Sequence, residues 1–146
     1  HFYENNKLSL SSLYNLHTIR DRAMNERVWL KHGGYLVIQP TEALTVIDVN
    51  SGKNQSRKED TILRINLEAA QEIAKQLRLR NISGIILVDF INMDDDELMQ
   101  QLIKEMRILC GKDPVQTTVV DVTELQLMEI TRKKVRKPLY ECWRKR

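Results

Sequence analysis

The stretch GIILVDFINM, residues 84 to 93, has four aliphatic residues in a row between Gly84 and Asp89. Such a run is typical of a strand in the centre of a sheet, covered on both faces. A second strand-like stretch, LTVIDVNSGKN at residues 44 to 54, also carries an aspartate, Asp48, inside its apolar run. An ionised carboxylate among apolar side chains is unfavourable unless it is paired, protonated or bound to a metal. The two aspartates therefore need an explanation.

Regular elements are predicted on both sides of these stretches. Apolar residues recur at spacings of three and four in some segments and follow one another or alternate in others. We expect helices at 9–26, 60–80 and 94–110, and strands at 27–30, 33–40, 41–50, 84–90, 115–122 and 125–131. Asp60 or Thr61 is expected to cap the second helix. From the first strand onward the order β-β-β-α-β-α-β-β predicts a mixed α/β (α+β) domain, a mixed sheet flanked by helices.

Composition restricts the class of protein. The chain has 146 residues, of which 42% are hydrophobic and 29% charged, as in an ordinary globular domain. No run approaches the roughly 20 apolar residues that a membrane span needs. Two cysteines, Cys110 and Cys142, are too few for a disulfide scaffold and favour a reducing cytoplasm. The opening residues His1 to Tyr3 resemble the interior of a longer protein, so we expect the chain to be a fragment.

Charge is distributed unevenly. Residues 131 to 146 contain eight basic residues and one acid, whereas the remaining 130 residues contain fifteen basic and nineteen acidic residues. A basic segment attached to a mildly acidic body suits a polyanion such as RNA. The alternative is a solvated helix end or a linker.

Three roles are open to Asp48 and Asp89. They could form salt bridges with Lys53, Arg78 or Arg80, cap backbone amides just past their strands, or share one cation at neighbouring strand ends. Asn50 lies two residues after Asp48, so both side chains leave the same face of the strand. Mg²⁺ suits such a site because it takes one or two carboxylates and keeps several waters.

Three motifs carry a resemblance to a known family. The segments GGYLVIQPTEALTVIDVNSGK, INLEAAQEIAKQLRLRNISGIILVDFINM and LMEITRKKVRKPL closely resemble the ribonuclease E/G family of bacterial endoribonucleases. The resemblance implies a deoxyribonuclease-I-like catalytic subdomain at 27–130, preceded by a helix at 1–26 from an absent upstream domain and followed by a basic tail at 131–146.

The resemblance also implies a chemistry. Asp48 and Asp89 would hold one catalytic Mg²⁺, for which Mn²⁺ can substitute, and Asn50 would orient water or phosphate. The reaction would be hydrolysis of single-stranded RNA to 5′-phosphate and 3′-hydroxyl ends, in RNA processing and decay. The candidate RNA-binding residues are Lys53, Arg78, Arg80, Arg132 and Lys133. Because the family's upstream RNA-binding domains are missing, we expect weak activity or none from the isolated chain.

The sequence departs from the family pattern in several places. Gln116 stands where the family has an arginine that helps to recognise the RNA 5′ phosphate. Glu124 and Gln126 replace a basic residue and a glycine. Cys142 is followed by Trp143, so the family's shared zinc site is not predicted, although a homo-oligomer is compatible with the resemblance. The alternative from another class is a non-catalytic RNA-binding or assembly module with structural carboxylates.

Overall fold

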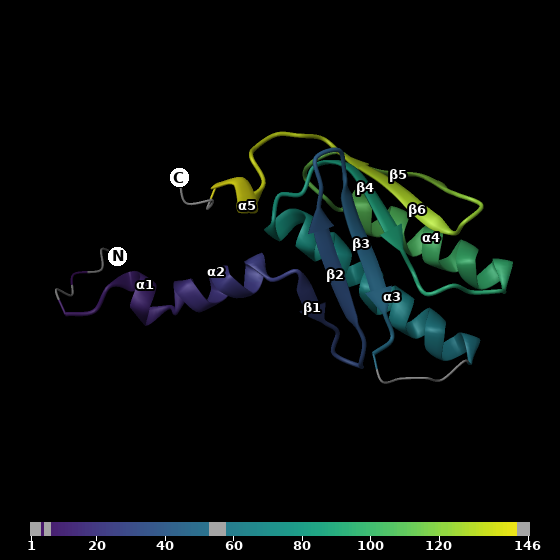
Figure 1. Cartoon of the computed structure of the whole chain (residues 1–146), viewed down its shortest axis with the longest axis horizontal. Helices are drawn as coiled ribbons and strands as arrows, with labels where there is room; N and C mark the ends of the chain where they lie inside the picture. Colours follow the sequence, from purple (N-terminus) through teal and green to yellow (C-terminus); the bar gives the residue numbers. More distant parts are fainter. Residues whose placement is uncertain (1–3, 5–6, 53–57, 143–146) are drawn as a thin grey trace.

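A computed structural model of the chain describes residue 4, residues 7–52 and residues 58–142. Its centre is a six-stranded mixed sheet with the strand order β1-β2-β3-β4-β6-β5 (Figure 1). The strands are β1 (Arg27–Trp29), β2 (Tyr35–Pro40), β3 (Thr45–Asn50), β4 (Gly84–Asp89), β5 (Thr117–Val122) and β6 (Leu127–Arg132). Strands β3 and β4 are parallel, and every other neighbouring pair is antiparallel.

Two long helices cover one face of this sheet, α3 (Glu59–Leu79) and α4 (Asp96–Gly111) (Figure 1). The core lies between them and the alternate strand residues that point inward, such as Leu36, Ile47 and Ile86, all at 0% exposure. The opposite face of the sheet carries no helix among the described residues. The predicted mixed α/β class is confirmed, together with the order of its main strands and helices.

Local sequence explains both helices. In α3, Ile65, Ala69, Ile73 and Leu77 recur every four residues and form the buried stripe. The N-cap position of α3 is Lys58 and not Asp60 or Thr61 as predicted, since Glu59 and Asp60 already lie in the first turn, where acids favour the helix dipole. In α4 the side chain of Asp95 accepts hydrogen bonds from the amides of Glu97 and Leu98.

Two expectations about regular structure are wrong. Strand β4 is central but covered on one face only, and Ile85 on its other face is 51% exposed. The expected helix at 9–26 is divided into α1 (Leu10–Leu13) and α2 (Leu16–Met24), because Asn15 adopts a left-handed conformation with φ of 51°. Asparagine tolerates this conformation better than most residues.

Helices precede β1 and follow β6 in the described part of the chain. Helices α1 and α2 extend from the body as an arm, and a short helix, α5 (Leu139–Cys142), follows β6 (Figure 1). Several large apolar side chains of the arm are exposed, among them Leu13, Tyr14 and Ile19. Among the described residues, no helix combines the length and apolar character that crossing a membrane requires.

Candidate metal centre

Asp48 and Asp89 are direct partners in the parallel pairing of β3 with β4. Adjacent strands lie about 4.8 Å apart, and residues in register point to the same face. Both are near or at the carboxyl ends of their strands, where β3 ends at Asn50 and β4 ends at Asp89. Their buried neighbours Ile47 and Val88 point into the core. The two carboxylates therefore stand side by side on the open face.

Asn50 is part of the same arrangement. Its Nδ2 donates a hydrogen bond of 2.6 Å to Oδ2 of Asp48, which fixes one carboxylate oxygen. The pKa of Asp89 is raised above its ordinary value, first because partial burial disfavours the charged form and second because of the negative charge of Asp48. A cation bound between the two aspartates would relieve that repulsion.

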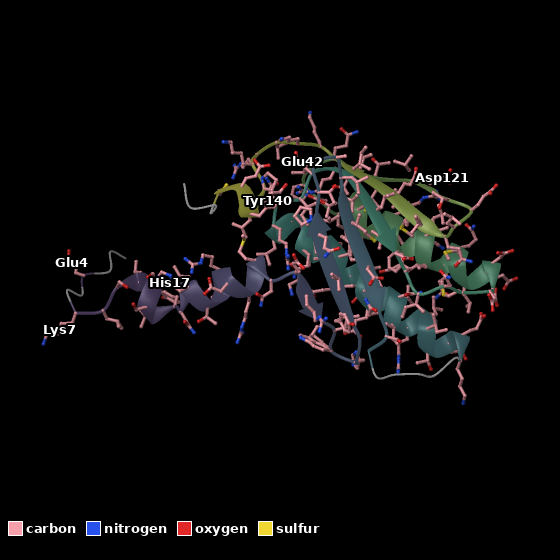
Figure 2. All side chains as sticks on the ribbon, viewed as in Figure 1. Glu4, Lys7, His17, Glu42, Asp121 and Tyr140 are labelled. Carbon is pink, nitrogen blue, oxygen red and sulfur yellow. The ribbon has the colours of Figure 1, made fainter. Side chains whose placement is uncertain are left out.

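Among the described residues, which do not include Lys53, the structure gives the other two roles of these aspartates no support. Within the described residues, neither carboxylate lies within salt-bridge distance of a Lys or Arg or accepts a backbone amide hydrogen bond. The described histidines lie elsewhere: His17 is on the α1–α2 arm (Figure 2), and His32 pairs with Glu68.

The donor set fits Mg²⁺. In the described part of the chain, no group of three or more His, Cys, Asp or Glu side chains could hold a metal. Structural zinc sites need four nitrogen or sulfur ligands, whereas Mg²⁺ takes one or two carboxylates and fills its shell with water or phosphate oxygens. The two paired carboxylates and the neighbouring amide therefore suit Mg²⁺ and do not form a structural zinc site.

Two amide side chains hold the segment that follows Asp89. Asn66 of α3, fully buried, donates from Nδ2 to the carbonyl of Ile91 (2.8 Å) and accepts from the Ile91 amide (3.1 Å). Gln126, before β6, donates from Nε2 to the carbonyl of Met93 (3.2 Å) and accepts from the Met93 amide (3.3 Å). Gln126 has a φ of 61°, a conformation that glycine adopts without strain, so the two bonds to Met93 offset the strain of a larger residue here.

None of the predicted RNA-binding residues that the structure describes lies beside the carboxylates. Lys53 lies outside the described residues. Arg78 and Lys133 are exposed, but they lie at the end of the sheet where β4 begins and β6 ends, since Gly84 pairs with Arg132. That end is five residues, or about 16 Å, from Asp89. The basic tail therefore leaves the sheet at the end of the strands opposite to the two aspartates.

Arg132 is buried, so its side chain is not displayed on the surface as an RNA contact. Its side chain is 3% exposed, and its Nε donates to Oδ2 of Asp113 at 2.8 Å. Its Nη1 donates to Asn81 and to the carbonyl of Ile82. In the sequence, Arg132 begins a basic run and so resembles a surface residue. In the structure, its side chain points inward at the end of β6, and it supports the fold.

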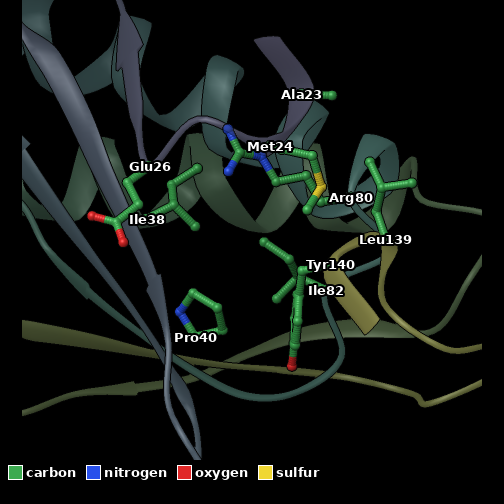
Figure 3. A pocket seen from close by; sticks show the side chains of 9 residues that line it. All are labelled: Ala23, Met24, Glu26, Ile38, Pro40, Arg80, Ile82, Leu139 and Tyr140. Carbon is green, nitrogen blue, oxygen red and sulfur yellow. The ribbon is translucent and has the colours of Figure 1, made fainter. Parts of the chain in front are cut away.

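Arg80 is also buried, at 7% exposure, and lines a separate cavity of about 290 Å³. The cavity lies between the end of α2, strand β2 and helix α5, with Met24, Ile38 and Tyr140 among its lining residues (Figure 3). Nε of Arg80 donates to Gln76 at 2.7 Å. Burial lowers the pKa of Arg80, although the charge of Glu72 opposes this. Arg80 is therefore no surface contact for RNA in this chain.

Sequence reasoning missed a cluster on the open face, formed by Arg27, Trp29 and Tyr35. Cζ of Arg27 lies 4.4 Å from the centre of the Tyr35 ring and 5.7 Å from that of Trp29. The two rings are 5.1 Å apart, centre to centre. Each residue fits an ordinary strand when considered alone. Only the alternation in RVW and YLVI, which puts all three on one face, could have indicated the cluster.

Comparison with known proteins identifies the chain's relatives. Residues 1–135 match the model of the ribonuclease E/G family. The chain belongs to that family. It is 47% identical over 128 residues to ribonuclease E of Synechocystis sp., a match that covers 86% of this chain and 19% of the relative. It is 41% identical over 126 residues to ribonuclease G of Salmonella typhimurium, covering 85% of this chain and 26% of the relative.

The ribonuclease E/G match confirms the resemblance expected from the sequence motifs. It contains Asp48, Asn50 and Asp89, and it ends inside the basic segment, before α5. Ribonuclease E of Nostoc sp. matches at 46% identity over 123 residues, which are 83% of this chain and 18% of that relative. The chain thus spans about a fifth to a quarter of the length of these three ribonuclease E/G relatives.

Proposed function

We propose that this chain is the metal-binding catalytic part of an endoribonuclease that uses Mg²⁺ to hydrolyse single-stranded RNA. The products would carry 5′-phosphate and 3′-hydroxyl ends, and the reaction would serve RNA processing and decay. The observation that carries the proposal is the pairing of Asp48 with Asp89 on the open face, without a basic partner among the described residues. Relatives named ribonuclease E and ribonuclease G support the same reaction class.

The residues of the site have separate tasks. Asp48 and Asp89 would hold the cation with one carboxylate from each strand. When bound, Mg²⁺ supplies positive charge that polarises a phosphodiester and makes water a stronger acid. Asn50 holds Asp48 in position through its Nδ2 and can use the oxygen of its amide to orient water or a phosphate oxygen. Asn66, in helix α3, holds the segment after Asp89 in place through its hydrogen bond to the carbonyl of Ile91.

The competing proposal is a non-catalytic RNA-binding or assembly module. The position of the basic surface favours it, because exposed basic residues of α3 and of the segment after β6 lie far from the two aspartates. These residues are Arg78, Lys133, Lys134, Arg136 and Lys137. In this alternative, RNA would contact the basic end alone, and the aspartates would serve the fold.

The catalytic proposal and the module proposal are distinguished by measuring cleavage of a labelled single-stranded oligoribonucleotide by the full protein that carries this chain. Asp48→Asn and Asp89→Asn should each abolish Mg²⁺-dependent cleavage and leave the thermal unfolding temperature equal or higher, because each change removes one of two adjacent like charges. Asn50→Ala should reduce cleavage less, since it removes orientation and not a ligand. Glu42→Gln, in the turn before β3 (Figure 2), is the control for loss of one negative charge. Normal cleavage by either aspartate variant would establish the module instead.

The proposal includes a wider setting. The chain would act in the cytoplasm beside RNA-binding segments of the same full protein, and two free thiols, Cys110 and Cys142, fit a reducing compartment. We expect residues 1–146 alone to cleave weakly or not at all, because misplacing a substrate by about 1 Å can cost on the order of 100-fold in rate.

A further inference from the structure

The cluster of Arg27, Trp29 and Tyr35 has the features of a ligand surface. Trp29 is 68% exposed, so packing explains little of its position. No carboxylate in the described part of the chain lies within salt-bridge distance of Arg27. The two ring faces hold its guanidinium instead, by contacts of the cation–π kind. Its N–H groups are therefore available to an anion.

Strand register places this cluster beside the aspartates. Trp29 pairs with Tyr35, and Tyr35 pairs with Asn50. In the neighbouring row, Arg27 pairs with Val37, Val37 with Asp48, and Asp48 with Asp89. Cross-strand partners point to the same face, and each strand adds about 4.8 Å. The Tyr35 ring therefore lies one strand from Asn50, and Trp29 lies two strands away, on the same open face as the metal centre.

The turn between β1 and β2 packs closely against the end of β3. Gly34, with a φ of 91°, lies so close to β3 that an added Cβ would meet the carbonyl oxygen of Asn50 at 2.5 Å. Only glycine permits this approach. The aromatic pair is thus held against the strand that carries Asp48 and Asn50.

We propose that Arg27, Trp29 and Tyr35 bind the nucleotide next to the phosphodiester that is cut, with its base stacked on the rings and its phosphate near Arg27. The inference rests on the proposed endoribonuclease function and adds a substrate-binding position to it. Aromatic stacking accepts every base, because each base has a π face, and it requires an unpaired strand. This cluster, an aromatic platform of Trp29 and Tyr35 with Arg27 beside it, would therefore select single-stranded RNA without selecting a sequence.

A fluorescence experiment tests the platform without cleavage. The full protein with Asp48→Asn would be titrated with oligoribonucleotides that carry 2-aminopurine at successive positions around a cut site mapped with the active protein. Stacking quenches this base, so the strongest quenching is expected at a position next to the cut. Adding Trp29→Ala should remove that quenching and weaken binding by about 10-fold, the effect typical of losing one stacked base. Trp29→Phe should restore most of both.

A matched control and a second variant complete the test. Tyr14→Ala removes an aromatic ring that is 63% exposed on the N-terminal arm and should change neither quenching nor affinity. Arg27→Ala should lower the salt dependence of binding by about 0.7 units of log–log slope, as for one phosphate contact. Quenching and affinity that stay unchanged in Trp29→Ala, or change only at positions remote from the cut, would overturn the platform. Metal-dependent cleavage could still stand, because this readout does not need it.

Discussion

Asn66 of α3 and Ile91, two residues after Asp89, exchange two hydrogen bonds between a buried side-chain amide and the backbone. The amide group of Asn66 thus acts like one more residue of a strand, pairing with a segment that has left the sheet. It fixes the direction of the chain at the point where β4 delivers its carboxylate. These two hydrogen bonds explain why Asn66, a polar residue, is fully buried (0% exposed) in α3.

Asn66→Ala should therefore affect both stability and the proposed metal centre. It leaves the amide and carbonyl of Ile91 without partners, at roughly 1–3 kcal/mol for each buried group left unpaired. Thermal unfolding would measure the loss, and calorimetric titration with Mn²⁺ would show weaker binding. Ala70→Gly, also in the buried part of α3, is a control that lowers stability without touching Ile91. Equal Mn²⁺ affinity in both variants would show that Asn66 serves stability alone.

Gly34 offers a second test of how the site is positioned. Gly34→Ala combines a strained positive φ with an overlap against the Asn50 carbonyl, so we expect it to cost about 2 kcal/mol or more. Gly84→Ala has a similar φ of 85° but meets nothing within 4 Å, and so reports the strain alone. The difference between the two free energies of unfolding isolates the overlap. Similar losses in both would mean that β3 moves aside easily.

The ion pair of Asp113 and Arg132 should be a main support of the fold. Both side chains are at most 3% exposed, and removing one partner of such a pair typically costs about 3–5 kcal/mol. Asp113→Asn should therefore lower the free energy of unfolding strongly in chemical denaturation. Asp21→Asn is the control, because its pair with Arg20 is exposed and should contribute little.

The same pair predicts a pH dependence. Burial alone would raise the pKa of Asp113, but hydrogen bonds from Arg132, Thr117 and the Val115 amide, with the charge of Arg132, hold that pKa below its ordinary value of 3.8. The stability that Asp113 contributes is thus present above about pH 4 and lost as the pH falls through the lowered folded-state pKa. The unfolding free energies of the protein and of Asp113→Asn should converge in acid. A constant difference down to the lowest pH would contradict this.

The basic tail supplies the last prediction. Replacing by Ala the four exposed basic residues in the described part of the tail should weaken RNA binding and reduce the log–log salt slope by about 0.7 for each lost phosphate contact. These residues are Lys133, Lys134, Arg136 and Lys137. Arg132 is left intact because it supports the fold. The control removes four exposed basic residues of α3, α4 and the turn after α4, namely Lys75, Lys104, Arg107 and Lys112. Equal salt slopes in the two variants would show that the tail has no special contact with RNA.

Sequence alone predicted the main strands and helices and singled out the residues of the proposed metal centre. The recurrence of Leu63, Leu67, Ala70, Ala74 and Leu77 at spacings of four and three indicates a helix because a helix repeats every 3.6 residues. The aliphatic run before Asp89 indicates a central strand. Each aspartate stands out because a carboxylate conflicts with the apolar residues around it. All of these signals are local, within a few residues along the chain.

Tertiary structure alone decided which residues meet. Arg132 has the sequence context of a basic surface residue, but the pairing of β6 with β4 turns it inward to Asp113. Arg80, at the end of α3, is buried where α2, β2 and α5 come together. The row from Trp29 through Tyr35 to Asn50 exists only because two hairpin registers align. A shift of one residue in either register would send one side chain of that row to the other face. Registers depend on contacts between strands, and the local pattern of a single strand does not contain them.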